Sequence, residues 1–518
     1  MASMLSRRIV LKQIPALAAA TALSIKMSGI TNVQAADLAI DELAKELAEQ
    51  SQGQIVRPGN PGHDKIYPYN GRFDCIKTTA YLRPASVEGV QKIVAWANRR
   101  RRTLAIRGGG HSFEGKSNHS ELVIDMSRLK KLNFNRDGTV SVEAGVQLGD
   151  VYKTLGAAGH VLPAGTCPTV GIVGHALGGG IGDFLPMFGY AAQSLQDVTL
   201  VTMAGTVLKV SDLGLDVLGG TPLPTADLRA SDVMKVIRGG GQGSLGVVTN
   251  MTFRAYDVRQ SKLASFRLES AGDVSPQRSI AIIQSWLTWR EALPKQMHSL
   301  VSSKLDLSRS GSGCSFAIAG LIAIPAESSI RVADIRKTLD VLFQIPELRN
   351  KKYSPSLNAT GAVKSFLDDD ETTNNPKRKW LYGSSSALPA ALPRRAVEYL
   401  VGNLKSRINA SFYTSGGNSK AGPETSLHPS EFIVEWTTYS PRRDPGAHGR
   451  IRDLRGGVMK VAGFDDYAFP NYPDNEARDY FPNMLQIADL AKRLDPVGIS
   501  TSSLLRESPQ SGLDGKCL

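Results

Sequence analysis

Residues 163–182 read PAGTCPTVGIVGHALGGGIG, and a shorter glycine run, RGGGHS, occupies residues 107–112. Because glycine lacks a Cβ, both stretches predict loops whose backbone N–H groups are open to a ligand, as in phosphate-binding turns. Each loop also carries one nucleophilic side chain, Cys167 in the longer loop and His111 in the shorter. Together they indicate a large anionic cofactor that the main chain cradles and that both side chains are placed to bond.

Length and charge set the class of protein. A chain of 518 residues with 42% apolar and 21% charged residues is typical of a globular enzyme with two domains. The formal charge of +13 falls to +9 (13 − 4) without residues 1–35, which hold four basic residues and no acidic one. The arginine run at 99–102 closes a helix whose buried side carries Val90 and Ile93, and cations favour a helix C-terminus. We therefore expect a solvated helix end there and no nucleic-acid partner.

The beginning of the chain resembles an export signal. Residues 6–12, SRRIVLK, resemble the twin-arginine motif, and they precede a mildly apolar run at 14–25 and a VQA cleavage pattern at 33–35. The apolar run is too short to span about 30 Å of hydrocarbon as a helix, so no membrane segment is expected in the mature chain. An ordinary secretory signal is the alternative. The twin-arginine interpretation predicts a bacterial protein that this export machinery carries, already folded with its cofactor, to the periplasm or outside the cell.

Cysteine and histidine spacing argues against a disulfide scaffold and against a metal site. The four cysteines, Cys75, Cys167, Cys314 and Cys517, are few and dispersed, and their spacing does not choose a single bridge. The sequence has no CxxC pair and no HExxH motif, so no metal is predicted.

Short strands alternate with helices in the first half of the chain. Strands are expected at 79–83, 103–106, 122–125, 139–143, 198–203, 207–210 and 247–254. Helices are expected at 36–54, from the Ser86 cap to the arginine run, and at 147–158. Residues 212–230, rich in Leu, Gly and Pro, are expected to be irregular.

Longer amphipathic elements follow in the second half. Helices are expected at 279–292, 330–343 and 484–494, and strands at 300–307, 315–324 and 432–439. This pattern is typical of an antiparallel sheet with covering helices, so the predicted fold class is α+β.

Residues 241–246, GQGSLG, match the GxGxxG pattern of dinucleotide-binding folds. That fingerprint requires a helix to begin at the glycines, whereas the sequence predicts a strand at 247–254. We therefore expect no Rossmann-type NAD site.

Three motifs in a fixed order carry a family resemblance: residues 107–112, residues 163–182 and IRGGGQGSLGVVT at 237–249. They resemble the FAD-binding domain of the vanillyl-alcohol-oxidase superfamily and, more narrowly, the berberine-bridge-enzyme-like oxidases. The resemblance implies a PCMH-type FAD-binding domain with two subdomains and a substrate domain built on an antiparallel sheet. The implied boundaries are 1–35 for the signal, 36–257 for the FAD domain, 258–460 for the substrate domain and 461–518 for a segment returning to the FAD domain.

The same resemblance implies how the cofactor is held. His111 corresponds to the residue that bonds the 8α carbon of FAD, and Cys167 to the residue that bonds C6, so the attachment would be bicovalent. Further contacts are implied for Arg107, Gly108, Gly109, Gly110, Ser112, Val170, Gly171, Gly174, His175, Gly178, Gly179, Gly180, Gly182, Gly246, Val248 and Asn471. For the glycines, tight turning alone is the alternative. Val170 matches a position that controls oxygen access, where valine is permissive.

Removal of a hydride from an alcohol carbon requires a base for the hydroxyl proton. Residues 468–474, AFPNYPD, resemble a family segment whose second tyrosine, here Tyr472, is an implied base. Glu435 in FIVEWTTY is the other candidate, and strand alternation places it on one face with Thr437 and Tyr439. A solvated edge residue is the alternative for Glu435, and the choice of base stays open.

Together these features predict a secreted or periplasmic FAD-dependent oxidase. It would take a hydride from an alcohol carbon of a polar small molecule, such as a carbohydrate, and reduce O2 to H2O2. Two alternatives remain: a dehydrogenase that passes electrons to a quinone or protein carrier, and a flavin-retaining binding protein without turnover. The sequence does not indicate the particular substrate or the oligomeric state.

Overall fold

The computed structural model describes residues 32–222, 227–362, 379–417, 421–473 and 479–505. It divides into two compact units, residues 1–46 and 47–518. The described part of the first unit belongs to helix α2 (Asn32–Glu49), which ends earlier than the predicted helix. The twin-arginine motif and the apolar run after it lie outside the described residues. No helix in the described ranges is long and apolar enough to cross a bilayer.

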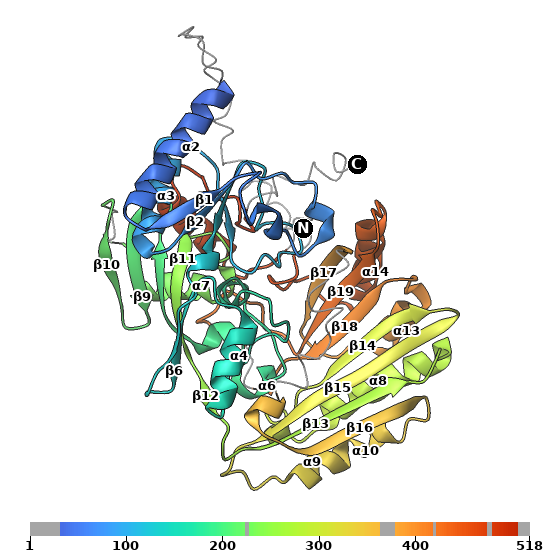
Figure 1. Ribbon diagram of the computed structural model, residues 1–518. Helices are drawn as coiled ribbons and strands as arrows, with labels where there is room; N and C mark the ends of the chain where they lie inside the picture. The colour runs from blue at the N-terminus through green and yellow to red at the C-terminus, as the bar shows by residue number, and fades with distance from the viewer. Residues whose placement is uncertain (1–31, 223–226, 363–378, 418–420, 474–478, 506–518) are drawn as a thin grey trace. The chain divides into compact units, whose positions relative to one another are not determined.

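Four strands form the sheet from which the shorter glycine loop emerges; Figure 1 labels β1 (Gly53–Val56) and β2 (Ala80–Pro84) of this sheet. The order of the four strands is β1, β2, β4 (Leu122–Asp125) and β3 (Ala105–Arg107). The last three are parallel, and β1 is antiparallel to β2. Helix α3 (Val87–Arg99) begins where the Ser86 hydroxyl accepts a hydrogen bond of 3.0 Å from the Gly89 N–H, as predicted. Strand β3 leads directly into RGGGHS, which fixes the direction from which that loop arrives.

A second sheet has six antiparallel strands. Their order is β10 (Gly214–Gly220), β9 (Thr206–Ser211), β8 (Leu195–Val201), β11 (Val247–Arg254), β6 (Thr139–Glu143) and β5 (Leu132–Phe134). The strands predicted at 198–203, 207–210 and 247–254 are confirmed. The prediction of irregular chain at 212–230 is wrong at 214–220, where β10 pairs with β9 although nearly all of its residues are exposed. Backbone hydrogen bonds to β9 therefore stabilise β10, and a pattern of apolar residues in the sequence does not reveal such bonds.

Helices α4 (Leu148–Ala157), α5 (Ile172–Leu177) and α7 (Ala230–Gly240) complete this part of the chain. Helix α7 ends within the glycine motif at 238–246, and strand β11 follows it. A helix does not begin at the GxGxxG glycines, so the local structure excludes the Rossmann arrangement, as expected.

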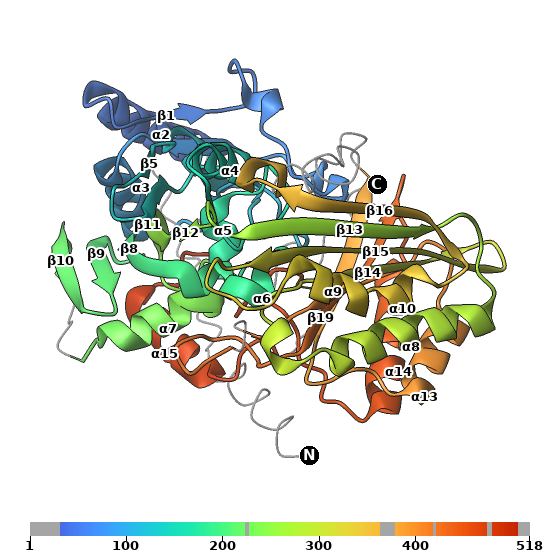
Figure 2. The ribbon, with the colours of Figure 1, turned by 90° about the horizontal axis from the view of Figure 1, so that it is seen from below.

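A seven-stranded antiparallel sheet dominates the second half of the chain. Its order is β16 (Leu348–Leu357), β13 (Lys262–Ser270), β15 (Gly313–Ile324), β14 (Lys304–Ser310), β18 (Asn409–Thr414), β19 (Phe432–Ser440) and β17 (Trp380–Leu388). Figure 2 shows one face covered by helices α8 (Pro276–Ala292), α9 (Val332–Thr338), α10 (Asp340–Phe343), α13 (Arg394–Asn403) and α14 (Ala447–Ala462). The predicted antiparallel sheet with covering helices is confirmed, although the helix predicted at 330–343 is interrupted at Leu339.

Side-chain alternation gives the seven-stranded sheet an apolar face and a polar face. Trp436 and Val434 of β19 are fully buried in the core beneath the helices, where Trp436 packs edge-on against Phe412 of β18. Glu435 and Thr437, which alternate with them, line a cavity on the opposite face. The predicted orientation of Glu435 is thus correct, and this face positions the site.

A buried cluster around the Arg72–Glu114 ion pair joins the two halves of the molecule through His448. Arg72 and Glu114 are both almost fully buried and pair at 2.9 Å between Nη2 and Oε2. The Arg72 Nη1 atom also lies 2.7 Å from His448 Nε2 of α14. Burial strengthens such pairs because little water screens them, so this cluster fixes the first half of the chain against α14.

The end of the described chain returns to the first half. Helix α15 (Met484–Leu494) packs against α7, and the Leu104 N–H, just before β3, donates 2.8 Å to the Ile499 carbonyl. Of the four cysteines, Cys75 is disulfide-bonded, whereas Cys167 and Cys314 are thiols.

Candidate functional site

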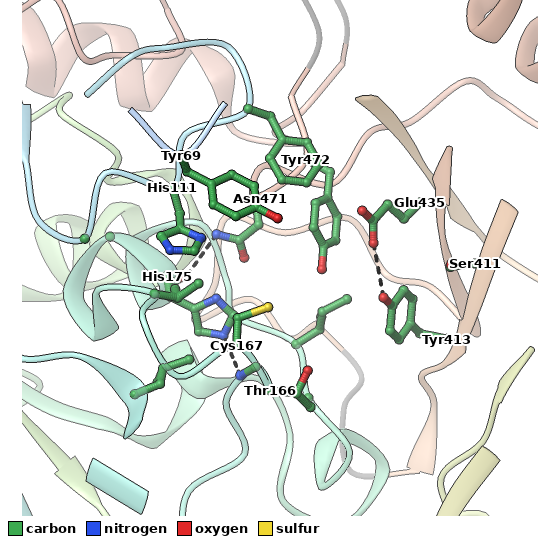
Figure 3. Close-up of a pocket in the computed structure, with 18 of the residues that line it drawn as sticks. Tyr69, His111, Thr166, Cys167, His175, Ser411, Tyr413, Glu435, Asn471 and Tyr472 are labelled. Atoms are coloured by element: carbon green, nitrogen blue, oxygen red, sulfur yellow. Dashed lines mark hydrogen bonds between the residues drawn. The ribbon is translucent and has the colours of Figure 1, made fainter. Parts of the chain in front are cut away.

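A cavity of about 1220 Å³ lies between the two glycine loops and the polar face of the seven-stranded sheet. Typical ligand pockets occupy about 300–1,000 Å³, so this cavity has room for a large ligand and a second molecule. Its lining includes both nucleophilic side chains, His111 and Cys167, and both candidate bases, Glu435 and Tyr472 (Figure 3).

The two glycine loops touch through their backbones. A Cβ at Gly109 would lie 2.3 Å from the Gly171 nitrogen, and a Cβ at Gly171 would lie 2.5 Å from the Gly109 nitrogen. At Gly110 the backbone has φ of +78°, and a Cβ would collide with the guanidinium of Arg107. Only glycine fits at these positions, because any side chain would force the two loops apart.

The nucleophile of the shorter loop is held in a defined position. The His111 ring stacks on Tyr69 with centroids 4.2 Å apart, and His111 Nε2 lies 2.8 Å from Thr169 Oγ1 of the longer loop. Burial, reinforced by the Arg107 charge, lowers the pKa of His111 to about 3. The imidazole is therefore neutral near neutral pH, the form in which it is a nucleophile.

The longer loop is fixed at three points. The Tyr152 hydroxyl donates to the Gly165 carbonyl, and the Gly165 N–H donates 2.9 Å to His175 Nε2. Asn471 accepts from the Gly180 N–H at 2.8 Å and donates to the His175 carbonyl at 3.0 Å. Burial lowers the pKa of His175 to about 4, so its ring is neutral and can accept the Gly165 hydrogen bond.

The structure brings most of the sequence-predicted cofactor residues together. Those lining the cavity are Gly108, Gly109, Gly110, His111, Ser112, Cys167, Val170, Gly171, Gly174, His175, Gly182, Gly246, Val248 and Asn471. Four others, Arg107, Gly178, Gly179 and Gly180, are not part of this lining; they pack behind it. Arg107 supports Gly110, and the three glycines allow the chain to turn beside Asn471, Phe469 and Ala191.

The cavity lining has the features that a flavin dinucleotide requires. A Cβ at Gly174 would meet no atom within 4 Å, so this glycine leaves space where a side chain would project into the cavity. Backbone at Gly108 and Gly109 is exposed on the same wall. A thiol and a neutral imidazole also face the cavity, which is the donor set that a doubly attached flavin requires. The residues present therefore fit the group.

Glu435 lies on the opposite wall with an unusual environment for a carboxyl group. The Tyr413 hydroxyl donates 3.1 Å to Glu435 Oε2, as Figure 3 shows. Burial raises the pKa of Glu435 to about 7, although Lys304 and the Tyr413 hydrogen bond oppose the shift. Glu435 can thus change its protonation state near neutral pH, which suits a general base.

Tyr472 is positioned by strand β17. The Ser385 hydroxyl lies 3.1 Å from the Tyr472 carbonyl and 3.0 Å from that of Phe469, and the Tyr472 ring packs 5.4 Å from Phe113. Burial, followed by the neighbouring Tyr413 and Glu435, raises the pKa of Tyr472 well above its ordinary value. Its hydroxyl is therefore protonated near neutral pH and is a hydrogen-bond donor.

Several cavity residues were not identified from the sequence: Tyr69, Asp183, Lys304, Asp306 and Tyr413. On β14 the polar residues Lys304 and Asp306 alternate with apolar ones, and on β18 Ser411 and Tyr413 do the same. That alternation is the signal that could have placed them on the polar face. No comparable signal points to Tyr69, which lies in a loop.

Comparison with known proteins identifies an FAD binding domain at residues 78–211, a range that contains both glycine loops. The uncharacterized FAD-linked oxidoreductase YgaK of Bacillus subtilis is 38% identical over 173 residues, 33% of this chain and 36% of YgaK. Berberine bridge enzyme-like 19 of Arabidopsis thaliana is 26% identical over 511 residues, 87% of this chain and 84% of that protein. The chain therefore spans about a third of YgaK but most of the plant protein.

Solved structures share the fold along nearly the whole chain. Berberine bridge enzyme-like 1 of Physcomitrella patens superposes with a TM-score of 0.73 and 22% identity, covering 90% of this chain and 99% of that one. Chitooligosaccharide oxidase gives a TM-score of 0.73 with 20% identity, covering 91% and 98%. Xylooligosaccharide oxidase from Myceliophthora thermophila C1 gives 0.70 with 18% identity, over 91% and 98%. The predicted PCMH-type architecture is thus confirmed.

The lowered pKa of His175 predicts a loss of stability in acid. The folded state keeps this ring neutral down to about pH 4, whereas the unfolded chain binds the proton below its ordinary value of about 6.5. The stabilisation that comes from keeping His175 neutral is therefore fully present above about pH 6.5. As the pH falls towards 4, the free energy of unfolding decreases by about 3 kcal/mol in all. His175→Gln keeps an acceptor for the Gly165 N–H, so it should unfold with a weaker dependence on acid. Thermal melts between about pH 7.5 and about pH 4.5 measure this; equal losses in both proteins would contradict it.

Proposed function

The chain contains an FAD binding domain and has berberine bridge enzyme-like homologues, and from this we propose that it is an FAD-dependent oxidase acting on an alcohol carbon of a carbohydrate. One observation carries the proposal. A carboxyl group with a pKa near 7, Glu435, shares a single cavity with the two nucleophiles on the glycine loops. Such a cavity can deprotonate an alcohol next to a bound flavin.

We propose that His111 and Cys167 attach the cofactor at its 8α carbon and C6. When bound, FAD supplies the acceptor for the hydride at N5 and passes the two electrons to O2, which leaves as H2O2. The chain's own contribution is to hold the nucleophiles in place: Tyr69 and Thr169 fix the His111 ring, and the pinned longer loop fixes Cys167. The loop contact at Gly109 and Gly171 brings the two attachment points to one end of the cavity.

We propose Glu435 as the base and Tyr472 as a hydrogen-bond donor to the substrate. A base is most effective when its pKa lies near the working pH, which describes Glu435. The raised pKa of Tyr472 keeps its proton, so it can orient the substrate hydroxyl and does not remove the proton itself. The hydroxyl proton would pass to Glu435 as the carbon loses its hydride, giving a carbonyl product.

The polar wall supports a carbohydrate as the substrate class. Hydroxyl and amide side chains on this face, Ser308, Asn409, Ser411 and Thr437, can form hydrogen bonds to many hydroxyl groups at once. Two proteins with the same fold are described as oxidases of chitooligosaccharide and xylooligosaccharide.

Oxygen is the proposed electron acceptor. Val170 lines the cavity between the two glycine loops, where a small apolar side chain leaves space for a small apolar molecule. We also propose that residues 1–35 direct twin-arginine export of the folded, flavin-loaded protein to the periplasm or beyond.

Anaerobic mixing tests the function. A panel of mono- and oligosaccharides, simple alcohols and phenols is added to the flavin-loaded protein, and the visible flavin absorbance is followed. We expect at least one saccharide to bleach it and admission of air to restore it rapidly with stoichiometric H2O2. Rapid reoxidation by a quinone but not by air would instead identify a dehydrogenase, and no bleaching by any compound would contradict catalysis.

Substitution of the two candidate bases separates their roles. With an accepted substrate, Glu435→Gln should slow anaerobic flavin reduction by about 10²–10⁴-fold, the usual contribution of a general base. Tyr472→Phe should cost less, about tenfold, because it removes one hydrogen bond. In the wild type the rate should rise with pH through about 7 as Glu435 ionises. A larger loss in Tyr472→Phe than in Glu435→Gln would show that the tyrosine is the base.

A further inference from the structure

Glu435 belongs to a cluster of five side chains on the polar face of the seven-stranded sheet. Lys304 and Asp306 come from β14, Ser411 and Tyr413 from β18, and Glu435 from β19. Register makes them neighbours: Lys304 lies opposite Tyr413, Asp306 opposite Ser411, and Ser411 opposite Glu435. All five line the cavity (Figure 3 labels three of them, Ser411, Tyr413 and Glu435).

Side-chain contacts link the members of this cluster in a chain from Ser411 to Glu435. The Lys304 ammonium lies 3.0 Å from Asp306 Oδ1, and the same oxygen accepts a 2.6 Å hydrogen bond from Ser411 Oγ. The ammonium also lies 5.2 Å from the centre of the Tyr413 ring. Tyr413 in turn donates to Glu435. Asp306 and Ser411 therefore hold the Lys304 ammonium against the ring of Tyr413, the residue that donates to Glu435.

The cluster and its surroundings contain one cation and three carboxyl groups. Lys304 is the cation acting on the carboxyl groups of Asp306, Glu435 and Asp183, the last of which reaches the cavity from the opposite wall. Although burial disfavours its charge, these carboxylates raise the pKa of Lys304 above its ordinary value, so the ammonium is permanently charged near neutral pH. A cation among three carboxyl groups interacts with each of them more strongly at a protein wall than in bulk water, although the side chains of Lys304 and Asp306 remain 33% and 38% exposed.

We propose that Lys304 is a positioning residue, held by Asp306 and Ser411, that keeps the Glu435 carboxyl group ionised and hydrogen-bonded to Tyr413 at the cavity wall. The inference rests on the proposed role of Glu435 as base. Loss of the ammonium leaves burial and Asp306, which both favour the neutral carboxyl group, opposed only by the Tyr413 hydrogen bond. Loss of the Asp306 charge has the opposite effect, because Lys304 then acts on Glu435 without competition.

Other groups act on or respond to Glu435 and must be considered in any pH dependence. They are Tyr413, Tyr69, Tyr439 and Tyr472, together with Asp183 through its effect on Lys304. Burial raises the pKa of each tyrosine, so none ionises near neutral pH. The pKa of Asp183 is raised to about 6 by burial, so it is the one competing titration to be separated from that of Glu435.

The test measures the protonation of Glu435 directly in the flavin-loaded protein without substrate. Infrared difference spectra between the wild type and Glu435→Gln isolate the carboxylic C=O band of Glu435, and its intensity is followed against pH. We expect Lys304→Met to raise the midpoint by at least about one pH unit, the usual effect of losing an adjacent opposite charge. Asp306→Asn should lower the midpoint, and Lys304→Arg should leave it near that of the wild type.

Lys352→Met is the matched control. Lys352 is a lysine on the same cavity face, but it lies on β16, five strand positions from β19 or about 24 Å at 4.8 Å per strand. At that separation solvent and salt screen its charge, so the midpoint should not move. The pH dependence of flavin reduction by an accepted substrate should shift in the same directions as the infrared midpoints.

Opposite shifts in Lys304→Met and Asp306→Asn are the signature of charge, because general loosening would move both variants in the same direction. Unchanged midpoints, shifts of the same sign, or the absence of a titrating Glu435 band would each overturn the inference. Asp306→Asn and Lys304→Arg still decide the matter if Lys304→Met does not fold. Undiminished flavin reduction in Glu435→Gln would instead refute the proposed base, and the infrared midpoints would still test the role of Lys304.

Discussion

The contact between Gly109 and Gly171 is the constraint on which the site depends. Two loops more than fifty residues apart meet with no room for a Cβ on either side, so His111 and Cys167 arrive at one cavity from separate elements. Strand β3 delivers the first loop, and hydrogen bonds from Tyr152 and Gly165 anchor the second. A side chain at either glycine would force the two loops apart and so separate His111 from Cys167, although neither glycine reacts itself.

The seven-stranded sheet supplies the opposite wall of the cavity, and there too the backbone decides which side chains face it. Alternation sends Trp436 into a core that holds the sheet rigid and sends Glu435 into the cavity from the next position. The apolar face packs into the core, while the polar face brings several carboxyl groups and Lys304 together on the cavity wall. Burial at that wall raises the pKa of Glu435 to about 7, which is the property that the proposed base requires.

The sequence was sufficient for the elements with strong local signals. Ser86 identifies a helix start, the glycine motifs mark the two loops, and alternation in FIVEWTTY gives the correct face for Glu435. It was insufficient where pairing across the chain decides the structure. Strand β10 is stabilised by pairing with β9 and has no buried pattern of its own. Lys304 reaches Glu435 through the order β14-β18-β19, and that order could not be read from local periodicity.

The central claim is that the two glycine loops converge on one flavin, and peptide mass spectrometry after denaturation and proteolysis tests it most directly. The account predicts one cross-linked species in which the mass of FAD joins the peptide containing His111 to the peptide containing Cys167. In Cys167→Ala the flavin mass should remain on the His111 peptide alone. Release of all flavin from the unfolded wild type, or its recovery on a peptide containing neither residue, would contradict the account.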